Sequence, residues 1–230
     1  MTKFRGAALS LALAFLAFVA MSAAALAGDL SRYRNFQLGT DLPTVAKQAG
    51  ADPSRATLIH RRPALIQELE WYPQLFRSSS QTEPVKDVVF SFYDGELFRI
   101  TIDYDRYQTA GLTAGDMVEA ISAAYGIAAK PTGPANVAPA LYGDQQEVLA
   151  EWQDSQYRFD LIRGSYGPSF RLVGVLKRLE APFRTAIVEA ARLDEKEAPQ
   201  REIERIAKAG EAERTMLEQA RLVNKPKFRP

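Results

Sequence analysis

The sequence predicts an α+β protein built on an antiparallel sheet, and three observations lead to this fold class. Two regions contain runs of alternating apolar and polar residues, which indicate strands. Each region follows a short amphipathic segment that starts at a helix-capping residue and ends at a glycine. The last part of the chain is strongly charged with a thin apolar stripe, which indicates an exposed helix. With 230 residues, the chain can bury a core of its own.

The first 27 residues predict a cleavable signal peptide. Lys3 and Arg5 precede an apolar run, and Ala25-Leu26-Ala27 supplies the small-x-small pattern of a cleavage site. We therefore expect a mature protein that begins at Gly28, is periplasmic or secreted, and has no stable membrane insertion after cleavage. The alternative is an uncleaved anchor, because residues 7–27 carry no charge and are long enough to span a bilayer.

Composition narrows the function classes. Without cysteine the chain has no disulfides, thiolate metal sites, cysteine nucleophile or lipid-bearing cysteine, and this suits a bacterial periplasm. The nearly neutral charge lacks the basic signature of nucleic-acid binding. We expect neither a cofactor nor a metal site, since a single histidine cannot form a two-histidine site and no phosphate-binding glycine loop stands between a strand and a helix.

Residues 28–126 form the first predicted unit. Its helix covers about 41–49, starts at Thr40 or Asp41 and ends at Gly50. A strand at 65–72 and a hairpin at 86–104 follow, and then a second helix at 114–125, capped by Thr113.

The predicted hairpin has two candidate registers. A two-residue turn at Asp94-Gly95 opposes apolar Phe90 and polar Arg99. We prefer a three-residue loop, Tyr93-Asp94-Gly95, with glycine in the left-handed region, because it pairs Phe90 with Phe98.

The second half continues with a proline-rich loop at 127–145 and a strand unit at 146–182, with strands at about 147–153, 156–163 and 169–178. A charged helical extension covers 183–223, in which Pro199 is expected to start a new helix or kink the existing one. The basic tail at 224–230 is expected to be disordered.

Both halves therefore repeat the order helix, strand, hairpin. The only two tryptophans, Trp71 and Trp152, follow Glu70 and Glu151 in the strands after the two short helices. We predict a tandem duplication in which these tryptophans take matching buried places, while the glutamates point outward.

Two segments share a pattern of a glycine, an apolar helix and a closing glycine. They are Phe36-Gln37-Leu38-Gly39 through Val45 to Gly50, and Gly111-Leu112-Thr113 through Met117 to Gly126. They resemble the openings of beta-lactamase inhibitor protein-like folds, in which Gly-Met-Thr is followed by an apolar helix and a glycine. That group includes the small lipoprotein of the outer-membrane barrel assembly machinery. The resemblance implies an α+β fold whose sheet face binds another protein. The whole chain also looks similar to exported proteobacterial proteins that supply no activity to carry over.

The polar residues with the most chemical interest are Asp103 and Asp105, which alternation places on one side of a strand, with Arg99 nearby. Neighbouring carboxylates can share a proton or bind a hard cation. The simpler interpretation is an exposed sheet face with Asp103 paired to Arg99 or Arg106. His60 stands beside two arginines, which indicates a solvated turn or edge.

We predict from these observations a non-catalytic envelope protein that binds another envelope protein through its sheet. The first alternative is an envelope hydrolase that uses carboxylates such as Asp103 and Asp105. The second is a structural protein held on the cell wall or an anionic surface by its basic tail.

Overall fold

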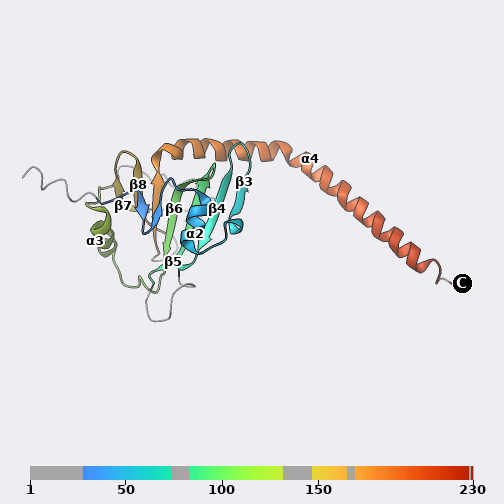
Figure 1. The fold of residues 1–230 in the computed structure, drawn as a ribbon, viewed down its shortest axis with the longest axis horizontal. Helices are drawn as coiled ribbons and strands as arrows, with labels where there is room; N and C mark the ends of the chain where they lie inside the picture. Colours follow the sequence, from blue (N-terminus) through green and yellow to red (C-terminus); the bar gives the residue numbers. More distant parts are fainter. Residues whose placement is uncertain (1–27, 74–82, 132–146, 165–168, 228, 230) are drawn as a thin grey trace, which may run out of the picture. The chain divides into compact units, whose positions relative to one another are not determined.

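The computed structural model describes residues 28–73, 83–131, 147–164, 169–227 and 229, so the predicted signal peptide and most of the proline-rich loop lie outside the described residues. It confirms a mixed α+β fold with an antiparallel sheet (Figure 1). The chain divides into two compact units. The first ends at Phe183, and the second begins at Arg184. The elements are β1 (Arg32–Tyr33), β2 (Phe36–Gln37), α2 (Leu42–Ala49), the 3-10 turn η1 (Pro53–Arg55), β3 (Thr57–His60), β4 (Ile66–Trp71), β5 (Val85–Tyr93), β6 (Glu96–Tyr104), α3 (Ala114–Tyr125), β7 (Glu147–Gln153), β8 (Tyr157–Arg163), β9 (Phe170–Leu176) and α4 (Lys177–Asn224).

Local capping starts both short helices where the sequence predicts. The Asp41 side chain accepts a hydrogen bond from the Thr44 amide at 2.8 Å, and Gly50 ends α2 in the left-handed conformation. Thr113 and Asp116 form a capping box at the start of α3. None of the helices in the described part of the chain is both long and apolar enough to cross a membrane.

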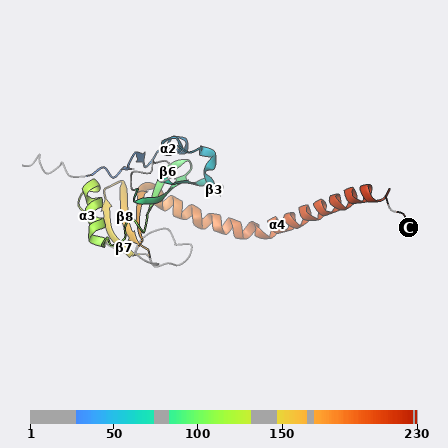
Figure 2. The ribbon, with the colours of Figure 1, turned by 90° about the horizontal axis from the view of Figure 1, so that it is seen from below.

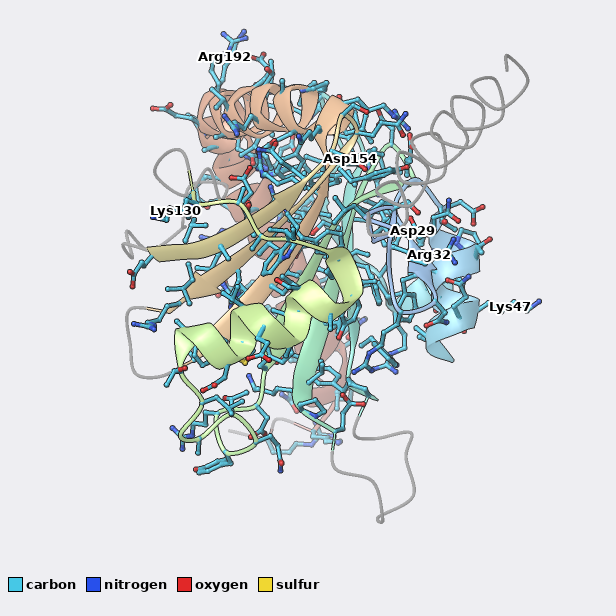
Figure 3. The ribbon with its side chains drawn as sticks, turned by 90° about the vertical axis from the view of Figure 1, so that its left-hand side faces the viewer. Asp29, Arg32, Lys47, Lys130, Asp154 and Arg192 are labelled. Atoms are coloured by element: carbon cyan, nitrogen blue, oxygen red, sulfur yellow. The ribbon has the colours of Figure 1, made fainter. Side chains whose placement is uncertain are left out.

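The first unit is built on a seven-stranded antiparallel sheet with the order β3-β4-β5-β6-β9-β8-β7. Both α2 and α3 pack on one side of it, here called the helix-bearing face (Figures 2 and 3). The core on this face contains side chains from both helices and from six strands of the sheet, among them Val45, Ile121, Leu69, Phe90, Ile100, Leu172, Leu161 and Trp152. Alternate residues of the same strands lie on the other side, here called the opposite face.

Apart from β3, the sheet consists of two halves with the same topology. In each half a helix precedes three strands in antiparallel succession, and the third strands, β6 and β9, meet in the centre. The register of this central pair relates the halves by an approximate two-fold axis through Thr101 and Val173. The register of the outer strands then places Trp71 on Trp152.

The helices of the two halves also correspond to each other. The same offset in residue number relates the positive-φ glycine Gly39 to Gly111, the helix cap Asp41 to Thr113, and buried Val45 to buried Met117. Trp71 and Trp152 both lie in the core on the helix-bearing face, but Trp152 is 1% exposed and Trp71 is only partly buried. The halves are thus equivalent in topology and unequal in packing.

The hairpin does not have the register that we predicted. Phe92 pairs with Leu97 around a two-residue turn in which Asp94 and Gly95 both have positive φ, as a type I′ turn requires. A bulge at Phe98 then shifts the register, so Phe90 opposes Ile100 instead of Phe98. The apolar mismatch is repaired inside the strand rather than in the loop.

Helix α4 begins earlier than predicted, at Lys177, immediately after β9. It continues through Pro199 as one helix, so a new helix at this proline is excluded. Within the second unit its charged side chains form ion pairs such as Arg192 with Glu189 at 2.6 Å and Arg205 with Glu202 at 2.7 Å.

Deleting residues 199–230 is expected to leave the melting temperature within a few degrees of the full chain. Every described residue from 198 onward is exposed, and exposed ion pairs contribute only about 0–1 kcal/mol each. Thermal unfolding followed by circular dichroism above 250 nm, where the core aromatics absorb, checks this. Loss of the cooperative transition in the truncated protein would contradict it.

Candidate functional site

Ionisable side chains gather in two clusters on the opposite face of the sheet. The first, here called the charged strip, consists of Lys86, Asp87, Asp103 and Arg171. The Arg171 Nε and Nη2 atoms donate to the two Asp103 oxygens at 2.7 and 2.9 Å, and these bonds raise the pKa of the guanidinium. Lys86 Nζ lies 3.0 Å from an Asp87 oxygen.

The strip contains a carboxylate pair, although not the predicted one. Asp103 is the register partner of Asp87 across β5 and β6. Asp105 lies beyond the end of β6, where its Oδ1 accepts hydrogen bonds from the Tyr107 and Gln108 amides at 2.7 and 3.2 Å. Asp105 thus caps a turn, while two cations flank the Asp87 and Asp103 pair.

Arg99, which the sequence places near Asp103 and Asp105, lies against two aromatic rings. Its guanidinium carbon lies 5.1 Å from the ring centroids of both Phe98 and Phe183. The two rings are themselves 4.3 Å apart. Arg99 takes the place in its half of the sheet that Arg171 takes in the other half, and its guanidinium makes cation-π contacts there.

The second cluster, here called the buried cluster, is centred on Arg158 of β8. Arg158 Nε donates to Asp160 Oδ2 at 3.0 Å, and its Nη2 donates to Glu180 at 2.9 Å in the first turns of α4. Glu151 on β7 is the register partner of Asp160, which places two carboxyl groups side by side across the strands. Two carboxylates therefore pair with one guanidinium, and the Glu151 side chain lies on the strand next to Asp160.

Asp160 is the most perturbed carboxyl group of the buried cluster. It is 5% exposed, and among the described residues none donates a hydrogen bond to its Oδ1. Burial raises the pKa of Asp160 to about 6, since desolvation outweighs the attraction of Arg158, and Glu151 and Glu180 add to the rise. Such a carboxyl group can take up or release a proton near neutral pH.

Asp160 was not predicted as a site residue, although the sequence contains one indication of it. The residue interrupts the apolar run of β8, between buried Phe159 and Leu161, and an arginine two positions earlier shares its side of the strand. A charged residue flanked by core residues needs a partner, and Arg158 is one. Its neighbour Glu151 is partly buried on this face, whereas Glu70 is exposed and accepts a hydrogen bond from the Tyr72 hydroxyl at 2.6 Å.

Replacing Asp160 with asparagine is expected to flatten the pH dependence of stability. The folded pKa of about 6 exceeds the ordinary value of 3.8, so the folded protein holds this proton more tightly than the unfolded chain. Stability from this group is present below about pH 4 and is lost as pH rises through 6, for a total of about 1–3 kcal/mol. Urea unfolding at several pH values measures the free energy of unfolding of variant and parent. The same dependence of this free energy on pH in both proteins would contradict the prediction.

Within the described residues, no three histidine or acidic side chains are grouped so that they could hold a metal ion. His60 lies on β3, at one edge of the sheet, as predicted. No family model matches the chain, and comparisons with curated proteins and with solved structures likewise give no match. Function is therefore inferred from the geometry of these clusters.

Proposed function

We propose that this chain is a non-catalytic protein of the bacterial cell envelope that binds another envelope protein through the charged strip. The export signal predicted from the first 27 residues supports the compartment. The observation that most supports a binding role is the bidentate ion pair between Arg171 and Asp103. It holds both side chains in one orientation on a rigid sheet.

The charges of the strip are suited to recognition. The side chains of Lys86 and Arg171 are 65% and 37% exposed, so their cationic groups reach the surface while Asp87 and Asp103 anchor them. A fixed pattern of both signs selects a partner of complementary pattern and rejects others. Both Asp103 oxygens accept hydrogen bonds from Arg171, which supports a role for Asp103 as an anchor of this cation.

Site-specific photo-crosslinking in living cells tests this function. A photoreactive residue at Lys86 is expected to give discrete adducts that mass spectrometry can identify, and Arg171→Glu is expected to reduce them about tenfold. The matched control carries the photoreactive residue at Glu119, an exposed position on α3. Equal adducts from both positions, or none from Lys86, would contradict the proposal.

The buried cluster supports a second candidate, an envelope hydrolase that uses Asp160 and Glu151. The observation in its favour is the raised pKa of Asp160 beside a second carboxyl group. Release of soluble fragments from purified cell wall, abolished by Asp160→Asn in a folded variant, would establish it. Fragment release unchanged by this substitution, or not detected with the parent, would exclude it.

A further inference from the structure

The two edges of the seven-stranded sheet differ. At one edge, Ala129 covers the outer side of β7 through two backbone hydrogen bonds with Glu151, of 2.7 and 3.2 Å. At the other edge lies β3, whose inner side pairs with β4 through Thr57 and Glu68, and Leu58 and Gln67. In the described part of the chain no strand pairs with the outer side of β3.

Strand β3 also exposes apolar side chains. Leu58 and Ile59 are 43% and 40% exposed, and Thr57 is exposed as well. Natural proteins protect such an edge with a short strand, a bulge, a charge or a proline. Strand β3 has only four residues, and its register with β4 shifts between Leu58 and His60. Thr57, Leu58 and Ile59 carry neither a charge nor a proline, so the strand can still pair with a short added strand.

Positive charge stands at both ends of this strand. Exposed Arg55 precedes it, with Asp52 nearby, and exposed Arg61 and Arg62 follow it. Two copies joined antiparallel through β3 would place Arg61 of one copy near Arg55 of the other, which like-charge repulsion opposes. The same charges attract an extended segment with acidic residues at its ends.

We propose that the β3 edge is the docking site for an extended segment of a partner protein, with an apolar centre flanked by acidic residues, which joins the sheet as an added strand. This deepens the proposed function, on which it rests, by naming the chemistry of the partner. The backbone hydrogen bonds of β3 supply affinity, and the arginines at its two ends select acidic flanks.

The test uses the protein purified from the cell envelope and a synthetic peptide with an alternating Val-Thr centre and two glutamates at each end. Fluorescence anisotropy is expected to show binding at least about tenfold tighter than for the same peptide with lysine flanks. A peptide methylated on the backbone nitrogens of its centre is expected to lose binding, since it cannot pair as a strand. Hydrogen exchange is expected to slow across Thr57–His60 when the acidic peptide binds.

The variant Arg55→Glu/Arg61→Glu is expected to invert the preference toward the lysine peptide. The matched control is Lys47→Glu, which reverses an exposed charge on α2 that projects into solvent (Figure 3) and is expected to leave binding unchanged. Equal binding of the methylated peptide would overturn the proposal. Dimers in sedimentation that the double substitution stabilises would overturn it as well. Vesicle binding would also overturn it if the protein binds phosphatidylglycerol vesicles, loses that binding in the double variant and binds no peptide, because the edge would then belong to a membrane surface.

Failure here and failure of the proposed function can be told apart. Crosslinks from Lys86 in cells, together with no peptide binding at β3, would support the charged strip as the binding surface and reject only the docking site at the β3 edge. Peptide binding at β3 without crosslinks from Lys86 would do the reverse.

Discussion

Replacing Trp152 with alanine is expected to lower the free energy of unfolding by about 3–5 kcal/mol, because it removes a large, fully buried aromatic side chain. The indole is 1% exposed, and its Nε1 donates to the Gly126 carbonyl at 3.0 Å. It thereby joins β7 to the C-terminal end of α3. The substitution leaves both a cavity and an unpaired carbonyl at the helix end.

Trp71→Ala is the natural comparison, since the two-fold axis relates the two positions. We expect a smaller loss, of about 2 kcal/mol, because Trp71 is only partly buried, although its ring lies 5.0 Å from Phe36 and 6.4 Å from Phe90. Urea unfolding followed by circular dichroism measures both variants. A Trp71 loss equal to or larger than that of Trp152 would contradict the unequal packing of the two halves.

Replacing Gly174 with alanine is expected to cost about 3 kcal/mol, the upper part of the usual range for overpacking. A Cβ atom at this position would lie 2.4 Å from Phe159 Cε1 and 2.6 Å from its Cζ. The phenyl ring cannot move away easily, because it is fully buried and stacked on Tyr125 at 4.6 Å. In the other half Val88 and Ile102 take the places of Phe159 and Gly174, so the volume is divided differently across the strand pair.

Two further variants isolate the cause of this loss. Phe159→Leu in the Gly174→Ala background is expected to recover part of the stability, with a coupling of about 0.5–3 kcal/mol between the sites. Gly115→Ala serves as the control, because its new Cβ meets only Thr113 Oγ1 at an ordinary 3.6 Å, and it should change stability by less than about 1 kcal/mol. A Gly174→Ala protein as stable as the parent would show that the ring adjusts freely.

Local hydrogen bonds explain why the short helices could be predicted. Asp41 reaches Thr44, and Thr113 reaches Asp116, so each helix start depends on residues three positions apart. Alternation also placed Trp71 and Glu70 on opposite sides of β4, because the strand period of two needs no knowledge of neighbouring strands. The register predicted for the hairpin was wrong, because the bulge at Phe98 depends on packing across β5 and β6.

By itself, the sequence determined the α+β class, the helix caps, six strands of the sheet and the repeated order of elements, since these follow from contacts between residues close in the chain. Strand β3 was not predicted, because it depends on pairing with β4. Only the tertiary structure decided the candidate sites. Asp103 finds Asp87 across a hairpin and Arg171 from the other half of the sheet. Asp160 acquires its raised pKa from burial and from Glu151 and Glu180 on other elements. Charge interactions and desolvation depend on distance in space, and pairing between strands sets that distance, which spacing along the chain does not encode.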